Sequence, residues 1–169
     1  MLSMVCDVSI IIPNWNGGDA LGECLDSILR HTQGIGFELI VVDNGSSDDS
    51  AQEIRRLAAR EERLRAIYND ENLLFACACN QGYEHSKGRY ILIANNDILL
   101  RDDAVSSMVE YADAHPGVGV VTPRFCGLDG NPQEFYRRLP NVLFVFAHYH
   151  RLGRLIDQLI LKNSLSNHY

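Results

Sequence analysis

The sequence has no excess of basic residues. Its 169 residues include 15 Lys and Arg against 22 Asp and Glu, a formal net charge of −7, and the sequence pI is near 5.3. A general nucleic-acid binder needs a basic face against the phosphates. The charge therefore argues against nucleic acid as a partner, and any polyanionic ligand would need local neutralisation.

Long apolar runs and a secretory leader are also missing. The apolar run Val142–Ala147 is bounded by Pro140 and His148, far short of the roughly 18 residues that a membrane-spanning helix needs. Met1–Asp7 lacks the basic start and apolar stretch of a signal peptide. The five cysteines, an odd number without a C-x-x-C pair, indicate free thiols in a reducing compartment. We therefore expect a cytoplasmic protein.

What the sequence does contain is a regular alternation of strand and helix patterns. Short β-branched apolar runs are typical of strands buried on both faces, and amphipathic helical patterns separate them. This alternation predicts an α/β fold, Rossmann-like, with a mostly parallel sheet and helices on both faces. The expected strands are Val8–Ile12, Phe37–Val42, Leu64–Tyr68, Tyr90–Ala94 and Val118–Thr122.

Local signals also predict where three of the helices begin. Asp19 is placed to cap the first helix, and Ser50 with Glu53 has the spacing of a capping box. Asp102 or Asp103 is placed to cap the last one.

Polar residues follow three of the expected strands. The segments are Pro13–Asn16 after the first strand, Asp43–Asp48 after the second and Asn95–Asp97 after the fourth. Because the carboxyl ends of parallel strands meet at one edge of a sheet, we expect these segments to surround one cleft.

The expected cleft is acidic and lacks a phosphate-binding loop. Neither G-x-G-x-x-G nor G-x-x-x-x-G-K-[ST] follows any strand. A diphosphate beside Asp97 would be repelled unless a divalent cation lay between them, and oxygen ligands suit Mg²⁺ or Mn²⁺. Asp43 is placed to accept a hydrogen bond from a ribose hydroxyl or a base N–H.

Each of these motifs taken alone has an ordinary structural explanation. Asp43–Ser46 has the composition of a turn, Asp48 that of a helix cap, and Asn95–Asp97 that of a loop before a helix. Trp15 is more often a packing residue than a stacking surface. The joint placement of the three motifs after three strands favours a ligand site.

Four segments of the chain carry a family resemblance. Val8–Asn16 ends in P-N-W-N, Glu38–Asp48 ends in V-V-D-N-G-S-S-D, Phe75–Gly82 reads F-A-C-A-C-N-Q-G, and Ala94–Asp97 reads A-N-N-D. In order, they resemble the P-x-[YW]-N turn, the V-D-[DN]-G-S-x-D motif, the F-A-x-A-x-N-x-G segment and the metal-binding D-x-D of inverting family 2 glycosyltransferases with the A-type fold. Rhamnosyltransferase-like members are the most similar.

The resemblance implies a function, a cofactor and a set of site residues. The function is hexosyl or rhamnosyl transfer from a nucleotide-diphospho-sugar to an acceptor hydroxyl with inversion, dependent on Mg²⁺ or Mn²⁺, as in polysaccharide biosynthesis. UDP or dTDP is the expected nucleotide, and the acceptor is an unidentified glycan or lipid-linked molecule. Asp97 is the expected metal ligand. The expected nucleotide-sugar-binding residues are Pro13, Asn16, Asp43, Asn44, Asn80, Asn95 and Asn96.

Two departures from the family pattern affect this interpretation. The family segment in full is N-x-G-F-A-x-A-x-N-x-G, which begins at Asn72 here, and Leu74 stands where it usually has Gly. The D-x-D keeps only its last acid, Asp97. The family's catalytic base lies in a later acidic motif that we do not find, so the catalytic residue is unknown and we expect a truncated chain. The alternative is a non-catalytic nucleotide- or metal-binding regulatory module. A receiver-like module would have acids directly after the first strand, where this chain has Pro13 and Asn14.

The two ends of the chain are expected to differ in role. Residues 1–140 would form the nucleotide-sugar-binding domain, and residues 141–169 an apolar, basic and helical segment. An amphipathic basic helix can lie on an anionic membrane, which would make the protein peripheral to the inner membrane face. Because exposed apolar area rarely stays solvated, we favour burial of this segment in a homo-oligomer. Its helically spaced apolar residues are Leu152, Leu155, Ile156, Leu159 and Ile160.

Overall fold

The structure, a computed structural model, describes residues 6–127 and 129–133. The chain divides into two compact units, Met1–Pro123 and Arg124–Tyr169. All the helices and strands below belong to the first unit. The expected boundary after residue 140 and the expected helical segment 141–169 lie outside the described residues.

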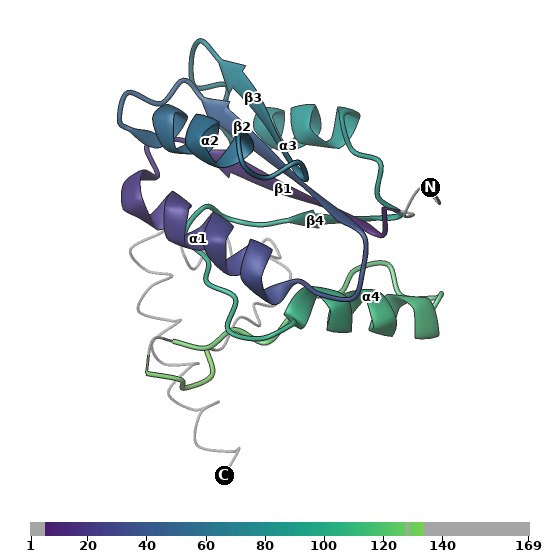
Figure 1. Ribbon diagram of the computed structural model, residues 1–169. Helices are drawn as coiled ribbons and strands as arrows, with labels where there is room; N and C mark the ends of the chain where they lie inside the picture. The colour runs from purple at the N-terminus through teal and green to yellow at the C-terminus, as the bar shows by residue number, and fades with distance from the viewer. Residues whose placement is uncertain (1–5, 128, 134–169) are drawn as a thin grey trace, which may run out of the picture. The chain divides into compact units, whose positions relative to one another are not determined.

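The first unit is built on a four-stranded parallel sheet. Its strands are β1 (Val8–Asn14), β2 (Phe37–Asn44), β3 (Leu64–Asn69) and β4 (Tyr90–Ile93). The strand order is β3-β2-β1-β4 (Figure 1), so the order reverses at β1, where α/β folds bind ligands. The predicted parallel sheet is confirmed.

Helices cover both faces of this sheet, as the sequence predicts. α1 (Gly18–His31), α2 (Ser50–Ala58) and α4 (Ala104–Ala114) share one apolar core with residues from the strands. α3 (Leu74–Glu84) covers the other face, where a smaller core forms around Ile11. Successive strand residues point to opposite faces, and the central strands β1 and β2 are buried at nearly every position because both of their faces are covered.

A glycine sets how closely α3 approaches the sheet. A side-chain Cβ added at Gly82 would collide with the Ile11 methyl group. The absence of a side chain at Gly82 therefore lets the helix lie directly on β1. This close packing holds the start of α3 near the carboxyl end of β2, where the Asn44 amide donates to the Leu74 carbonyl at 3.4 Å.

The expected fifth strand, Val118–Thr122, is wrong. The segment is not a strand, and Val120 is 88% exposed. Residues 118–121 instead line a groove of about 340 Å³ together with β4 and α4. Gly119 interrupts the apolar run, and β-branched composition predicts a strand only where a partner strand and a packed face are available.

The predicted helix starts are correct at only one of three helices. Asp103 caps α4, since its carboxylate accepts the Ser106 amide. Asp19 lies inside α1 and caps nothing, and Ser50 forms no capping box with Glu53. The side chains of Ser50 and Glu53 are committed to tertiary and ion-pair contacts instead, and such contacts override local helix signals.

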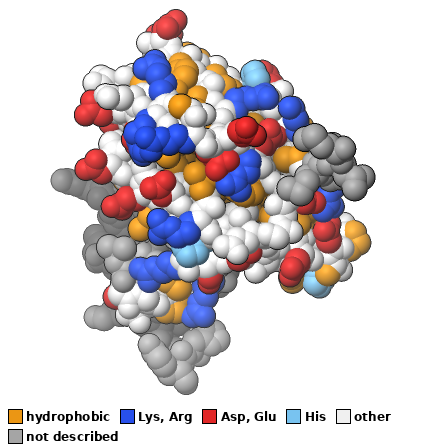
Figure 2. All heavy atoms as spheres, viewed as in Figure 1, with side chains coloured by type: hydrophobic (Ala, Val, Ile, Leu, Met, Phe, Trp, Pro, Cys, Tyr) orange, Lys and Arg blue, Asp and Glu red, His pale blue; other side chains and the backbone are white. Residues whose placement is uncertain are grey.

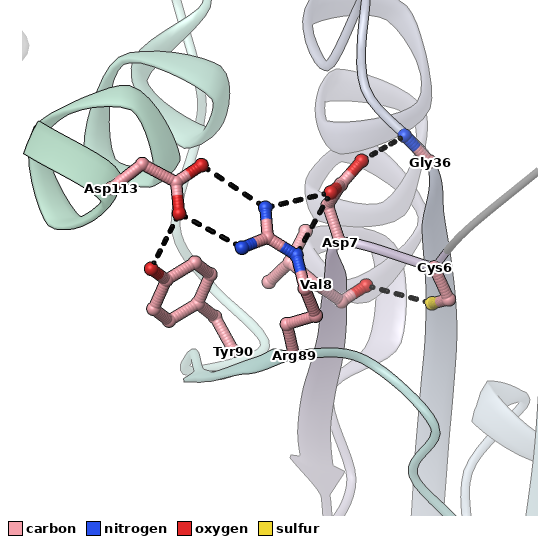
Figure 3. Close-up of polar contacts among 7 residues, drawn as sticks. All are labelled: Cys6, Asp7, Val8, Gly36, Arg89, Tyr90 and Asp113. Carbon is pink, nitrogen blue, oxygen red and sulfur yellow. Dashed lines mark hydrogen bonds and ion pairs between the residues drawn. The ribbon is translucent and has the colours of Figure 1, made fainter.

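Charged side chains on the described surface are intermixed. On the face seen in Figure 2, lysine and arginine lie among aspartate and glutamate over α1, α2 and the neighbouring loops. One ordered cluster lies at the amino-terminal end of the sheet (Figure 3), where Arg89 bridges two acids. Its guanidinium donates to Asp7 at 2.9 Å and to Asp113 at 2.8 and 3.0 Å, and the Tyr90 hydroxyl also donates to Asp113. This cluster ties α4 to β1.

The Arg89 cluster predicts a loss of stability in acid. Hydrogen bonds from Arg89 and then Tyr90 hold the pKa of Asp113 at about 2, below its ordinary value of 3.8. A depressed pKa stabilises the folded state above pH 3.8, and that contribution is lost as the pH falls towards 2. Urea unfolding midpoints should therefore fall less steeply between these pH values in Asp113→Asn than in wild type.

Glu110→Gln is the matched control for this measurement. Glu110 is an exposed acid on the same helix, so its variant should keep the wild-type slope. Identical slopes for wild type and Asp113→Asn would show that the cluster adds no acid-sensitive stability.

Candidate functional site

The polar ends of three strands meet at the carboxyl edge of the sheet. Asn14 ends β1 and lies directly opposite Asp43, near the end of β2. Asn96 follows β4 and donates from Nδ2 to Asn14 Oδ1 at 2.7 Å. The expected convergence of the three loops is therefore present.

Asn14 lies at the centre of this edge. Its Nδ2 donates to Asp43 Oδ1 at 2.8 Å and to Ser46 Oγ at 3.2 Å. Ser46 Oγ donates in turn to Asp43 Oδ1 at 2.6 Å. Asn14 is 1% exposed and Asp43 3% exposed, so these bonds are shielded from water. We refer to Asn14, Asp43, Ser46 and Asn96 as the Asn14 network.

Asn16 joins the loop after β1 to the loop after β2. Its backbone N–H donates to Ser46 Oγ at 2.9 Å, and its side-chain oxygen accepts the Ser47 N–H at 2.8 Å. Its φ of 53° is left-handed, a region that asparagine enters more readily than most residues. Asn16 is exposed beside Trp15, which is 56% exposed rather than packed.

The first amides of α1 are already bonded within the protein. The N–H groups of Gly17 and Gly18 donate to Ser50 Oγ at 3.1 and 3.2 Å, and Gly18 also donates to Asp48 at 2.9 Å. Hydrogen bonds from Ser50 and then Gly18 lower the pKa of Asp48. These two N–H groups are therefore not available to a diphosphate.

Asn44 faces into a second set of amides. Its Oδ1 accepts from Asn69 at 2.9 Å, and Asn69 exchanges two hydrogen bonds with Gln81 of α3. Asn44 is only 3% exposed, so its visible role is to hold the start of α3. Leu74 there has a φ of 69°, a conformation that favours glycine, which agrees with the glycine usual at this family position.

The remaining predicted residues are less connected. Pro13 is buried within β1, and Asn80 is exposed on α3 without a hydrogen bond to the Asn14 network. Asn95 is exposed, and its carbonyl accepts from the Cys24 thiol at 3.5 Å. Burial raises the pKa of Cys24 to about 12, which keeps that thiol protonated.

Asp97 suits a cation that is shared with a ligand. It is exposed, and no hydrogen bond or ion pair joins it to another residue in the described part of the chain. Residues 6–127 and 129–133 contain no group of three or more His, Cys, Asp or Glu side chains able to hold a metal ion by themselves. Mg²⁺ sites commonly combine one or two carboxylates with substrate phosphates and waters. A single exposed carboxylate fits that arrangement.

Sequence reasoning did not single out two residues of this site, Asn14 and Ser46. Both lie within the motifs named above, where the sequence pattern indicates only a turn for each. A usable signal was the position of Asn14 at the end of a buried strand, where an unpaired amide would be costly.

The fold and site together define a parallel α/β domain with an acidic, amide-rich edge at the carboxyl ends of its strands. The chain belongs to glycosyl transferase family 2, whose sequence model matches residues 9–167. It is 27% identical over 129 residues to the glycosyltransferase GlyG of Streptococcus pneumoniae, covering 76% of this chain and 42% of that protein. The chain thus spans less than half the length of this relative.

Solved structures share the fold. The Staphylococcus aureus protein TarS, residues 1–349 with UDP-GlcNAc, superposes with a TM-score of 0.58 at 20% identity, over 65% of this chain and 32% of that one. The mannosyltransferase PcManGT of Pyrobaculum calidifontis, with GDP-Man and Mn²⁺, has a TM-score of 0.59 at 24% identity, over 65% and 35%. The predicted A-type glycosyltransferase fold is confirmed. Among the described residues, no helix is long and apolar enough to span a bilayer.

Proposed function

We propose that this chain binds a nucleotide-diphospho-sugar together with Mg²⁺ or Mn²⁺, as the donor-binding part of an inverting glycosyltransferase. UDP or dTDP is the proposed nucleotide and an acceptor hydroxyl the destination of the hexosyl or rhamnosyl group. The observation that carries the proposal is the Asn14 network, which joins the carboxylate at the end of β2 to the loop that bears Asp97.

Asp43 is the proposed nucleoside ligand. Its Oδ1 already accepts from Asn14 and Ser46, whereas its Oδ2 accepts only a long bond of 3.4 Å from the Ser46 N–H. The second oxygen therefore keeps acceptor capacity for a ribose hydroxyl or a base N–H. Trp15 offers an exposed aromatic surface next to this carboxylate's loop, suited to stacking on a base.

Asp97 is the proposed protein ligand of the cation. When bound, the cation would neutralise the diphosphate and stabilise the departing nucleoside diphosphate. Such neutralisation suits this acidic edge, where Asp43, Asp48 and Asp97 lie at or just after the ends of the strands. The N–H groups of Gly17 and Gly18 there are already bonded to Ser50 and Asp48.

No described carboxylate is well placed as the base that would deprotonate the acceptor. Asp103 caps α4, and Asp113 is bound by Arg89 and Tyr90 at the amino-terminal end of the sheet. Asp129 accepts from Asn131 in the second unit. We propose that none of these carboxylates is the base, and that this chain by itself binds the donor without transferring its sugar.

Titration calorimetry with UDP tests the proposed site. Wild type should bind UDP at least about tenfold more tightly with Mn²⁺ than with EDTA, because the cation removes the repulsion between Asp97 and the diphosphate. Asp97→Asn should lose this difference. Asp102→Asn, which removes another exposed acid of the same segment, should keep it.

The Asp43 arm of the experiment separates nucleoside from metal recognition. In EDTA, where no cation contributes, Asp43→Ala should weaken UDP binding by about 1 to 3 kcal/mol, the usual effect of leaving polar partners unpaired. Equal UDP affinity with Mn²⁺ and EDTA in wild type would remove the metal role of Asp97. Unchanged affinity in Asp43→Ala would leave that residue a turn former.

A further inference from the structure

We propose that Asn14 is a positioning residue that couples nucleoside binding at Asp43 to cation binding beside Asn96. Each ligand would then strengthen the binding of the other. The inference rests on the proposed function, since it needs a nucleoside at Asp43 and a cation at Asp97, but it assigns a role to a residue that touches neither.

The Asn14 amide connects the two loops directly. Its nitrogen end donates to Asp43 and Ser46, and its oxygen end accepts from Asn96 at 2.7 Å. Within the described part of the chain, Asn14 is the only side chain that hydrogen-bonds both to Asp43 and to the loop after β4. Its whole hydrogen-bonding capacity at the nitrogen is used in this way, and it is 1% exposed.

The chemistry of an amide is required at this position. An aspartate of the same size would place a second carboxylate against Asp43 and could not donate. An alanine or serine would not reach Asn96 across the same gap. Only a side chain with a donor end and an acceptor end can hold a carboxylate on one side and an amide nitrogen on the other.

The connection gives a route for coupling. Asn96 immediately precedes Asp97, so the bond to Asn14 restrains the backbone that carries the proposed cation ligand. A nucleoside that fixes Asp43 also fixes Asn14 and, through it, residues 95–97. The cation then loses less conformational entropy when it binds to this loop. By linkage, the cation must favour the nucleoside to the same degree.

A second contact holds the same loop without reaching Asp43. The Cys24 thiol of α1 donates to the Asn95 carbonyl at 3.5 Å. This contact would preserve the fold of the loop when the Asn14 bond is lost. Loss of Asn14 should therefore change the coupling more than it changes the structure.

The test measures one ratio, the Kd of UDP in EDTA divided by its Kd in Mn²⁺. Asn14→Ala should lower this ratio at least about fivefold relative to wild type, the smallest coupling usual in allostery. Asn96→Ala should lower it similarly, and the double variant should lower it no further than either single one. Asn96 is only partly buried, so Asn96→Ala provides the test even if Asn14→Ala fails to fold.

Ser106→Ala controls for the loss of a buried hydrogen bond. Ser106 is 8% exposed and donates to the Gln33 carbonyl at 2.7 Å, away from the Asn14 network. Its variant should melt at a lower temperature than wild type yet keep the wild-type ratio. A lowered ratio in Ser106→Ala as well would mean that the ratio reports general destabilisation, which overturns the inference.

The remaining outcomes separate the two proposals. A wild-type ratio near one would overturn both the proposed metal role and the coupling. A large wild-type ratio that Asn14→Ala and Asn96→Ala both retain would overturn the coupling alone and leave the proposed function standing. Additive effects of the two substitutions would show that they act independently and would also overturn it.

Discussion

Gly17→Ala is expected to weaken Mn²⁺-dependent UDP binding by about tenfold or more. A Cβ at Gly17 would collide with Asn14 Oδ1 and would lie 2.6 Å from Asn96 Nδ2, so both side chains must shift and we expect the bond between them to be weakened or lost. The backbone itself tolerates alanine, because the φ of Gly17 is −79°. The loss should therefore fall on binding more than on folding, and calorimetry together with thermal unfolding would show both.

Gly117→Ala is the matched control for this substitution. A Cβ there would meet nothing within 4 Å, so the variant should bind UDP as wild type does. Wild-type affinity in Gly17→Ala would show that the contact between Asn14 and Asn96 does not matter for the nucleotide.

The parallel sheet could be predicted because its strands contain short apolar runs that alternate with helical patterns. Continuous burial on both faces leaves a strong signal in β1 and β2, and helical periodicity marks the covering helices. Val118–Thr122 shows a similar composition without the same outcome, since it pairs with no strand and residues 118–121 line a groove beside β4 and α4 instead.

The helix starts could not be read from local spacing. The Ser50 hydroxyl has a capping position in the sequence, but in the fold it accepts the amides of Gly17 and Gly18 from another loop. Asp48 makes a similar cross-loop bond. These contacts depend on which strands are neighbours, and a window of a few residues holds no information about that.

The sequence could predict where the candidate site lies, but not which of its residues are hydrogen-bonded to one another. Asp43 and Asn96 were expected at one edge because parallel strands end there, and the structure joins them through Asn14. The part played by Asn14 depends on its register opposite Asp43. The position of Asn14 opposite Asp43 follows from the pairing of β1 with β2. Along the chain, the segment Pro13–Asn16 has only the composition of a turn.

The purified chain is expected to transfer little or no sugar to an acceptor hydroxyl, even where it binds the donor. General-base catalysis contributes about 10² to 10⁴ in rate. Among the described carboxylates after Asp97, Asp103, Asp113 and Asp129 are bonded to other residues, and Asp102 and Glu110 are exposed. Release of UDP from UDP-sugars in Mn²⁺ should be slow and should not rise when an acceptor alcohol is added, because only water-driven hydrolysis would remain. Release that rises strongly with acceptor, and falls to background in Asp129→Asn, would contradict this expectation and would place the base in the second unit.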